Sequence, residues 1–274
     1  MEVTKNCSKH GDYLAKSVSL MGRCISTACP ICQQERADNA KQVVQAISAT
    51  NRTSKIEKLL NNAAIPPRFK NRSFENFKSD TDDKRYAAGV CRSMAANFDN
   101  CLMHGTSFLF CGKPGTGKSH LAAAIASTII HQGRSAVYTT VLRAIRSIKD
   151  TYRKDSDISE QKAINAFIAP DFLIIDEVGV QFGSETEKMY LFEILNGRYE
   201  HQKPTVLITN LSPKESAVFL GERVMDRLME GGGGILVFNW ESYRSKVASD
   251  PNLPVVNPQP VLWGNTGESA RRVI

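Results

Sequence analysis

The chain has no hydrophobic run long enough to cross a bilayer. Its longest apolar stretch, HLAAAIASTII at residues 120–130, is interrupted and falls short of the roughly 20 residues that a membrane-spanning helix needs. The first dozen residues are polar and do not have the pattern of a secretory signal. These absences predict a cytoplasmic protein with no membrane partner.

Cysteines are few and odd in number. Seven of the 274 residues are cysteines, and thiols in a reducing compartment rarely form disulfides. Spaced cysteines there are more often metal ligands. The sequence therefore disfavours a disulfide scaffold and makes the spacing of the thiols informative.

Acidic residues are outnumbered by basic ones. The 35 Lys and Arg against 28 Asp and Glu give a formal net charge of +7. This balance favours a polyanionic partner, although a merely soluble basic surface would have the same composition. With 42% hydrophobic residues, the chain can build one sizeable core and a small appendage.

One glycine-rich stretch has the signature of a phosphate-binding loop. FLFCGKPGTGKSHLAAAIA fits G-x-x-x-x-G-K-[ST], with a strand-like run before it and a helix-like run after it. The glycines let backbone N–H groups face the β-phosphate, Lys118 supplies positive charge, and the Ser119 hydroxyl is a Mg²⁺ ligand. The predicted ATP-binding residues are Gly112, Lys113, Pro114, Gly115, Thr116, Gly117, Lys118 and Ser119.

Polar side chains end two further strand-like runs. PDFLIIDEVG is apolar up to Asp176 and Glu177, and open α/β sheets bind ligands beyond the carboxyl ends of their strands. We expect Asp176 to hold Mg²⁺ through water and Glu177 to polarise the water that attacks the γ-phosphate. TVLITN ends in Thr209 and Asn210, and Asn210 is expected to orient the same water. A solvated acidic turn remains the alternative for the two carboxylates.

The start of the chain holds a second group of ligand-forming residues. Cys7-x-x-His10 and Cys29-x-x-Cys32 are two ligand pairs, and the segment between them is long enough for a strand hairpin. Three thiolates and one imidazole predict a closed, structural zinc site without catalysis. Cys24 is a rival for one place, and a set of unliganded thiols is the alternative. So small a module should not fold without its metal.

Composition divides the chain into four regions. Residues 35–64 are polar and contain no Pro or Gly, which predicts a helical arm, and Pro66 with Pro67 then breaks the helix. Apolar runs that alternate with helical patterns predict an α/β domain with a parallel sheet flanked by helices. The expected division is a zinc-binding module at 1–34, the arm at 35–64, an ATPase domain at 65–247 and a disordered tail at 248–274.

The motifs GKPGTGKSHLAAAI, IKDTYR, LIIDEVGVQ, GERVMDRL and FNWESYRS resemble those of AAA+ ATPases, and within them of the DnaC-type helicase loaders and their IstB-like relatives. Together with RSFENF they span roughly residues 66–247. The cysteine-rich start resembles instead the zinc-bearing N-terminus of phage and prophage versions of such loaders. The resemblance implies an AAA+ fold, ATP with magnesium, zinc, self-association on single-stranded DNA, and a replicative helicase as partner.

The resemblance also implies roles that the motifs alone do not assign. It makes Arg227 a finger that reaches into a neighbouring subunit's ATP, with Arg223 as the alternative; a planar, permanently charged fork suits this role. It also places Lys149 and Tyr152 on single-stranded DNA. A lysine three residues from an aromatic shares its helix face, so one can meet phosphate while the other stacks on a base. The other basic residues of this electrostatic track would be Arg143, Arg146, Arg153 and Lys154.

Less specific interpretations stay open for these residues. The two arginines could pair with acidic neighbours on a surface, and Tyr152 could be a core aromatic beside a solvated basic face. Two other functions also fit the core: an IstB-like transposition helper and an ATP-switched single-strand-binding protein with little turnover. A zinc module before an arm favours a loader, and Glu177 with Asn210 and Arg227 favours hydrolysis. We therefore expect an ATP-dependent DNA replication protein that grips a helicase through residues 1–64.

Overall fold

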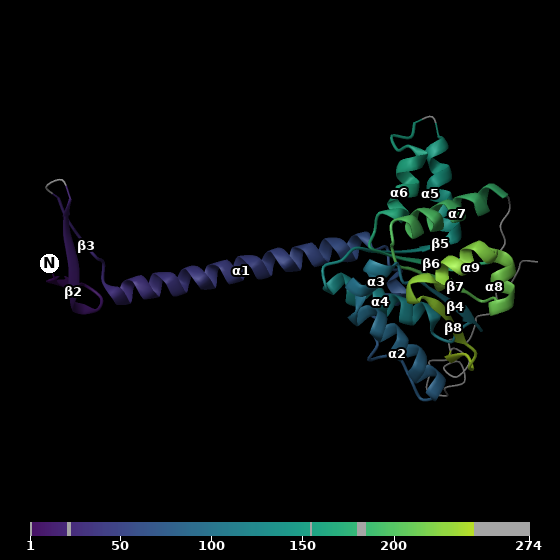
Figure 1. Ribbon diagram of the computed structural model, residues 1–274, viewed down its shortest axis with the longest axis horizontal. Coiled ribbons are helices and arrows are strands. Elements are labelled where there is room, and N and C mark those ends of the chain that lie inside the picture. The colour runs from purple at the N-terminus through teal and green to yellow at the C-terminus, as the bar shows by residue number, and fades with distance from the viewer. Residues whose placement is uncertain (1, 21–22, 154, 180–184, 244–274) are drawn as a thin grey trace, which may run out of the picture.

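The computed structural model describes residues 2–20, 23–153, 155–179 and 185–243. Lys154 and the tail expected at 248–274 lie outside these ranges. The described chain forms a small antiparallel sheet, one long helix and an α/β domain, in that order (Figure 1). No helix within these ranges has both the length and the apolar character needed to span a membrane.

The N-terminal sheet is a three-stranded antiparallel meander. Strand β1 pairs with β2, and β2 pairs with β3, so the hairpin expected between the two ligand pairs is present. Gly11 has a φ of 76° at the tight turn between β1 and β2, where it pairs with Cys7. The bounds are β1 Glu2–Cys7, β2 Gly11–Leu20 and β3 Arg23–Ser26.

A single helix, α1 (Pro30–Asn62), joins this sheet to the α/β domain. Its 33 residues correspond to about 50 Å of helix, and Figure 1 shows the two parts at its opposite ends. The helix begins earlier than the expected arm, because proline is well tolerated in the first turn. It ends before the two prolines, as expected. Pro66 is the N-cap of the short helix η1 (Pro67–Phe69), and Pro67 is its first residue.

The α/β domain is built on a five-stranded sheet in the order β5-β6-β7-β4-β8, with every pairing parallel. The carboxyl ends of β4, β6 and β7 therefore lie side by side at one edge. The strands are β4 Phe108–Gly112, β5 Ala136–Thr140, β6 Phe172–Val178, β7 Thr205–Thr209 and β8 Gly234–Phe238.

Helices cover both faces of the sheet. Helices α2 (Asp82–Ala96), α3 (Phe98–His104) and α4 (Lys118–His131) pack on one face. The other face is covered by α5 (Val141–Lys149), α6 (Glu160–Ile168), α7 (Glu185–Glu200), α8 (Pro213–Leu220) and α9 (Glu222–Met229). Two short 3₁₀ helices, η2 (Asp150–Tyr152) and η3 (Glu230–Gly232), follow α5 and α9. The predicted α/β class with a flanked parallel sheet is confirmed.

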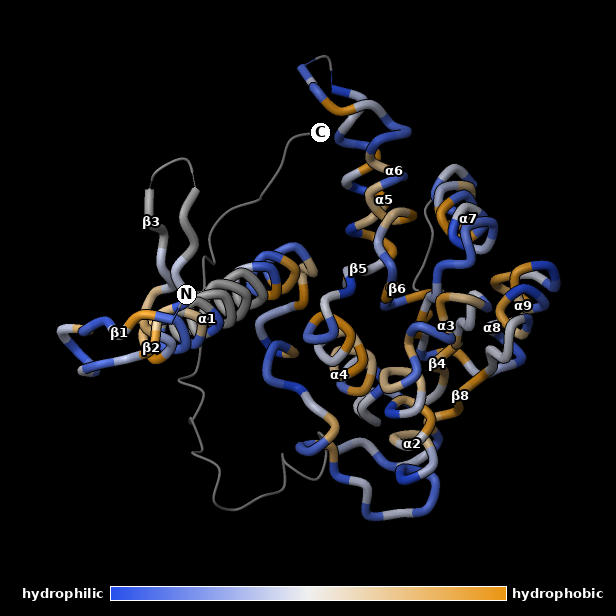
Figure 2. Tube along the Cα trace, turned by 60° about the vertical axis from the view of Figure 1, so that its left-hand side comes forward, coloured by the Kyte–Doolittle hydropathy of each residue, from blue (hydrophilic) through white to orange (hydrophobic). Residues whose placement is uncertain are grey.

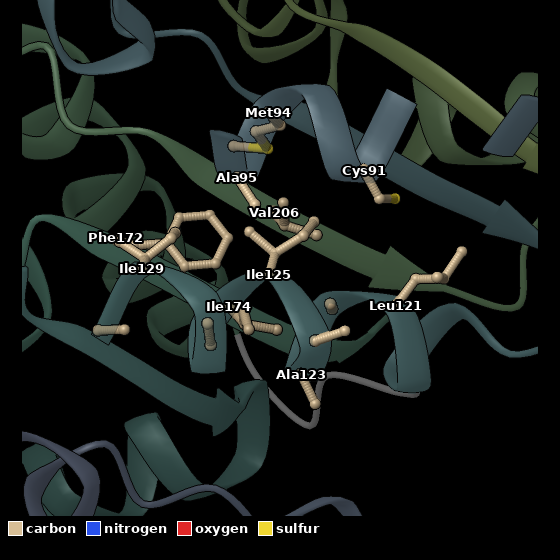
Figure 3. Packing of buried hydrophobic residues seen from close by; sticks show 14 of the residues in the cluster. Cys91, Met94, Ala95, Leu121, Ala123, Ile125, Ile129, Phe172, Ile174 and Val206 are labelled. Atoms are coloured by element: carbon tan, nitrogen blue, oxygen red, sulfur yellow. The ribbon is translucent and has the colours of Figure 1, made fainter. Parts of the chain in front are cut away.

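The alternation of strand side chains fills two separate cores. Ile174 and Ile208 face α4, whereas Leu173 and Leu207 face the second helical layer. Figure 3 shows Ile125 of α4 close to sheet residues and to α2. Each such fully buried aliphatic side chain contributes about 1.5–3 kcal/mol through its removal from water. Hydrophobic positions accordingly gather inside the domain, and polar ones predominate in its outer loops (Figure 2).

The last two turns of α1 belong structurally to the α/β domain. Leu59 and Leu60 pack against the α2/α4 core, and the Ala63 carbonyl accepts a 2.8 Å hydrogen bond from the Tyr138 N–H. This end of the helix thus extends the core and lies next to strand β5. The compositional boundary at residue 64 therefore runs through a packed interface.

Candidate functional site

The phosphate-binding loop connects β4 to α4, as its sequence predicts. Gly112 and Gly117 have φ angles of 119° and 99°, which glycine adopts without strain. A Cβ at Gly112 would lie 2.5 Å from the Phe238 carbonyl oxygen, and one at Gly117 would lie 2.6 Å from the Phe77 ring. Only glycine fits at these two close approaches. The loop leads directly into the N-terminus of α4, where backbone N–H groups favour an anion.

Lys118 lies inside this loop and is only 5% exposed. Its ammonium donates hydrogen bonds to the carbonyl oxygens of Gly112, at 2.6 Å, and Lys113, at 2.7 Å. These neutral acceptors are weaker partners for an ammonium than phosphate oxygens are. The lysine is thus held beside the place where phosphate would bind.

The two residues expected at magnesium are in direct contact. The Ser119 hydroxyl donates to Asp176 Oδ2 at 2.8 Å, and the Tyr138 hydroxyl donates to the same oxygen. The other carboxylate oxygen accepts from the Glu177 N–H at 2.7 Å. A hydroxyl and a carboxylate so close together are hard oxygen ligands of the kind that Mg²⁺ prefers. The residues present therefore fit a bound Mg²⁺.

Tyr138 is a site residue that sequence reasoning missed. It is buried in β5, and its burial, followed by the nearby Asp176 charge, raises the pKa of its hydroxyl above the ordinary value. The hydroxyl is therefore a neutral donor to the carboxylate. Only the pairing of β5 with β6, which sets Thr140 opposite Asp176, brings this tyrosine to the site. The sequence pattern SAVYTT contains no signal for it.

Glu177 stands at an irregular point in β6. Its φ of 61° is uncommon for a residue with a side chain, and the register between β6 and β7 shifts between Ile175 and Val178. Such irregularities at a strand end re-aim a side chain, and strained residues of this kind cluster at functional sites. The Glu177 carboxylate is exposed, in the wall of the same pocket as Lys118.

The two polar residues at the end of β7, Thr209 and Asn210, have different environments. Thr209 is buried, and its hydroxyl donates to the Val178 carbonyl at 2.6 Å, which ties β7 to β6. Asn210 is exposed and lines the pocket with Asp176 and Glu177. Both residues line the pocket, and Asn210 is the more exposed of the two.

A pocket of about 690 Å³ brings these side chains together. Its remaining walls come from residues 66–84, which reach into the first turn of α2, and from the chain after β8. The Trp240 indole N–H donates to the Thr116 carbonyl at 2.9 Å, and the Tyr243 N–H donates to the Gly115 carbonyl at 3.0 Å. These walls were missed as site residues, although the motifs RSFENF and FNWESYRS each contribute to one of them. The residues from the two walls that line the pocket are Pro66, Arg68, Phe69, Arg72, Asn76, Phe77, Lys78, Asp80, Lys84, Trp240, Glu241 and Tyr243.

The proposed arginine finger lies elsewhere. Arg227, in the last turn of α9, does not line the pocket of its own chain. Its guanidinium donates to Asn196 Oδ1 and lies over the Tyr199 ring, 4.5 Å from the ring centroid. Among the described residues, no ion pair involves Arg223 or Arg227, so the expected alternative of pairing with acidic neighbours is not seen.

The two residues expected on DNA are held by helix α7. Lys149 ends α5 and pairs with Glu187 at 2.7 Å, whereas Tyr152 follows in η2 and its hydroxyl contacts that of Tyr190. Both therefore contact α7 from the same segment, because side chains three positions apart align in the 3₁₀ turn that follows Lys149. Tyr152 is 58% exposed, which rules out the core-aromatic interpretation. The basic side chains of Arg143, Arg146 and Arg153 are exposed in the same segment.

The four predicted metal ligands converge on one point. The sulfur atoms of Cys7, Cys29 and Cys32 lie 3.7, 3.6 and 3.3 Å from His10 Nδ1, and all four ligand atoms lie within 4.8 Å of one another. The sulfur atoms of Cys7 and Cys32 lie 3.6 Å apart, close to the separation of about 3.8 Å that two Zn–S bonds of about 2.3 Å give in a tetrahedron. The arrangement fits a tetrahedral zinc ion. The side chain of the rival, Cys24, lies outside those that the structure describes.

The surroundings of this cluster also suit a metal. His10 Nε2 lies 3.1 Å from Glu35 Oε1, and a carboxylate on the second ring nitrogen fixes the orientation of a ligating imidazole. Hydrogen bonds, first of all from the backbone N–H of Lys9, lower the pKa of the Cys7 thiol to about 6, whereas the hydrogen bond with Cys7 raises the pKa of Cys32, so the first thiolate of the cluster is Cys7. Because Cys29 caps α1 and Cys32 lies in its first turn, a bound ion would join the small sheet to the arm.

Comparison with known proteins finds close relatives. The model of the family described as IstB-like ATP binding protein matches residues 33–250. The replicative helicase loader DnaC of Escherichia coli strain K12 is 39% identical over 202 residues, which are 74% of this chain and 81% of DnaC. The uncharacterized protein YdaV of the same strain is 34% identical over 203 residues, which are 74% of this chain and 80% of YdaV.

Solved structures share the fold. A crystal structure of the DnaC helicase loader superposes with a TM-score of 0.56 at 23% identity and covers 64% of this chain and 100% of that chain. The replication initiator DnaA, bound to AMPPCP and single-stranded DNA, superposes with a TM-score of 0.53 at 21% identity and covers 65% of this chain and 52% of that one.

Proposed function

This chain belongs to the family of IstB-like ATP binding proteins, and we propose that it is an AAA+ ATPase that loads a replicative helicase onto single-stranded DNA. The observation that carries the proposal is its 39% identity to a replicative helicase loader over 81% of that protein's length. The contact between Ser119 and Asp176 supports the ATP-hydrolysing part, because it unites the two side chains expected at Mg²⁺.

ATP with Mg²⁺ would bind at the carboxyl edge of the sheet. The loop N–H groups and Lys118 would hold the phosphates, and Lys118 would exchange its two carbonyl acceptors for charged oxygens. Ser119 and Asp176 would hold the metal, which supplies positive charge to the phosphate oxygens when bound. Glu177 would accept a proton from the attacking water, which Asn210 would orient.

Assembly would complete the reaction. Arg227 does not line the pocket of its own chain and is half-buried on α9, so its guanidinium is available to a second copy. A permanently charged fork stabilises the charge that develops on a transferring phosphoryl group. We therefore assign Arg227 to the ATP site of a neighbouring copy, with Arg223 as the exposed alternative.

Single-stranded DNA would lie along α5 and η2. The exposed Tyr152 ring offers a surface for a base, and Lys149 offers a positive charge for phosphate. Both side chains would have to leave their α7 partners, Glu187 and Tyr190, to do so. The exposed basic residues of α5 would add electrostatic attraction for the strand.

The N-terminal part would grip the helicase. The four metal ligands precede the residues that the family model matches, so this module lies outside the family core. We propose that zinc folds residues 1–34, that the arm of residues 35–64 carries this module away from the ATPase at 65–247, and that the module presents a rigid surface to the helicase.

Reconstitution tests this function. Purified protein, the host's replicative helicase and circular single-stranded DNA are incubated with ATP, and the helicase retained on the DNA is measured after gel filtration. We expect retention to require this protein with an intact Lys118. Equal retention without the protein, or a complex with a transposase in place of the helicase, would refute the assignment as a loader.

A further inference from the structure

Arg227 has two contacts, and both come from one helix. Asn196 Oδ1 accepts a hydrogen bond from the guanidinium, and the Tyr199 ring lies under it at 4.5 Å from its centroid. Asn196 and Tyr199 are three residues apart on α7, which puts them on the same side of that helix. The guanidinium is thus held both at its edge and at its face.

The tyrosine ring is itself fixed in place. The Tyr199 hydroxyl donates to Glu230 Oε2 at 2.7 Å, and Glu230 directly follows α9, the helix that carries Arg227. The ring therefore spans from α7 to the end of α9. It is still 39% exposed, so the stacked guanidinium is not enclosed by the protein.

The part of α7 that carries these residues is firmly anchored. Arg198, between Asn196 and Tyr199 in sequence, is 1% exposed and donates hydrogen bonds to the carbonyl oxygens of Ile168, at 3.0 Å, and Pro204, at 2.7 Å. These bonds tie α7 to the end of α6 and to the start of β7. Asn196 and Tyr199 therefore form a platform that is stationary relative to the sheet.

We infer that Asn196 and Tyr199 are positioning residues for the Arg227 finger. The inference rests on the proposed function, in which Arg227 completes the ATP site of a neighbouring copy. An arginine side chain has many rotamers, and a group that is pre-oriented before the partner arrives loses less freedom when it reacts. The platform holds the guanidinium in one direction while leaving one side of it open to a second chain.

The platform requires an aromatic ring at position 199 and a hydrogen-bond acceptor at position 196. The face of an aromatic ring attracts a cation, whereas an aliphatic side chain of similar size does not. Tyr199→Phe keeps this face and loses only the bond to Glu230, but Tyr199→Leu loses the face. Asn196→Ala removes the acceptor. A residue that served only to pack α7 against α9 would tolerate leucine about as well as phenylalanine.

The homogeneous variants provide the first measurement. We expect Tyr199→Leu and Asn196→Ala to lower kcat for ATP roughly 10- to 100-fold, as misplacement of a reacting group by about 1 Å does. The Kd for nucleotide should be unchanged, because the platform does not line the pocket of its own chain. Tyr199→Phe should keep most of the activity. Tyr86→Leu, which changes a 70% exposed tyrosine on α2, is the matched control and should behave as wild type.

Mixed assemblies separate positioning from damage to the ATP site or to the fold. Arg227→Ala mixed with Glu177→Gln should recover activity at the interfaces where each chain supplies what the other lacks, about a quarter of them at random 1:1 mixing. If Tyr199→Leu acts through the finger, Glu177→Gln should rescue it in the same way and Arg227→Ala should not. Absence of activity in the Arg227→Ala and Glu177→Gln mixture, with assembly intact, would refute the shared site and this inference with it. If that mixture is active, the inference alone is overturned either by a fully active Tyr199→Leu protein or by its failure to be rescued by Glu177→Gln.

Discussion

The Ser119 hydroxyl donates a 2.8 Å hydrogen bond to Asp176 Oδ2, across 57 positions of the chain. The same carboxylate oxygen accepts from the Tyr138 hydroxyl, so side chains from α4, β5 and β6 meet at one atom. Parallel strands place their carboxyl ends together, and the loop after β4 brings α4 to that edge. This contact is the structural basis for the prediction on Tyr138 below.

Replacing Lys118 with alanine should abolish ATP binding or turnover while the fold survives. The ammonium donates hydrogen bonds to two carbonyl oxygens of its own loop, and phosphate binding needs its charge. Fluorescent-nucleotide titration measures ATP binding, and thermal unfolding measures whether the fold survives. In a domain of this size a loss of about 1 kcal/mol lowers Tm by about 2–4 °C, so we expect a change no larger than this. Lys188→Ala, at an exposed ion pair on α7, is the control. Full turnover by Lys118→Ala would contradict the assignment of the ATP site.

Replacing Tyr138 with phenylalanine should weaken Mg²⁺ binding more than nucleotide binding. The change removes one donor from Asp176 and leaves the ring in its core position. A hydrogen bond to a charged acceptor contributes about 1.5–3 kcal/mol, so we expect the free energy of unfolding to fall and the half-saturating Mg²⁺ concentration to rise several-fold. Denaturant unfolding and Mg²⁺ titrations with nucleotide present measure the two effects. An unchanged Mg²⁺ requirement would mean that Ser119 and the Glu177 N–H suffice to orient the carboxylate.

Alanine at Tyr152 or at Lys149 should weaken single-strand binding in different ways. Loss of the ring should cost about 1–3 kcal/mol of binding free energy if a base stacks on it. Loss of the lysine charge should lower the slope of log K against log salt by about one. Fluorescence anisotropy over a series of salt concentrations separates the two, with Tyr86→Ala as the exposed-tyrosine control. Wild-type binding by both folded variants would place the DNA elsewhere.

Zinc should be present at about one ion per chain, and it should depend on the four converging ligands. Cys29→Ser with Cys32→Ser should lose the metal and unfold the small sheet, because a closed structural site supplies much of the folding energy of so small a module. Metal analysis and circular dichroism of the full chain measure both effects. Cys24→Ser is the matched control and should keep zinc; loss of zinc from this variant would make Cys24 a ligand in place of one of the four.

Removal of residues 1–53 should eliminate co-purification with the helicase and leave ATP binding intact. This cut spares Ile56, Leu59 and Leu60, which pack on the α2/α4 core, whereas a cut at residue 64 would expose that core. Pull-down of the helicase and nucleotide titration give the two readouts. A truncated protein that still loads helicase normally would show that the module serves another purpose, such as contact with DNA.

The phosphate-binding loop, the strand before it, the helix after it and the parallel sheet could be predicted because their signals are local. A glycine pattern between an apolar run and a helical run specifies strand, loop and helix within twenty or so residues, and buried parallel strands are continuous apolar runs. The ligand pairs Cys7 with His10 and Cys29 with Cys32 are local in the same sense. Their convergence to within 4.8 Å depends on β2 and β3 bridging the distance between them.

Element boundaries were less predictable. The arm begins at Pro30 and not at residue 35, because the helix extends into the second ligand pair, and its far end packs into the core of the α/β domain. Lys149 and Tyr152 were expected on one α-helix, but the α-helix ends at Lys149 and a 3₁₀ turn, in which side chains three positions apart align, follows. Composition alone does not predict where an α-helix changes to a 3₁₀ turn or where tertiary packing lengthens a helix.

The sequence by itself determined which residue types were available for phosphate, magnesium and zinc, since glycine spacing and ligand spacing are properties of the chain. The tertiary structure alone decided which other residues join them. Tyr138 reaches Asp176 through the β5–β6 pairing, and Asn196 and Tyr199 reach Arg227 through the packing of α7 on α9. Such contacts join residues about 30 to 40 positions apart, and their partners are set by strand order and helix packing, for which no local pattern exists.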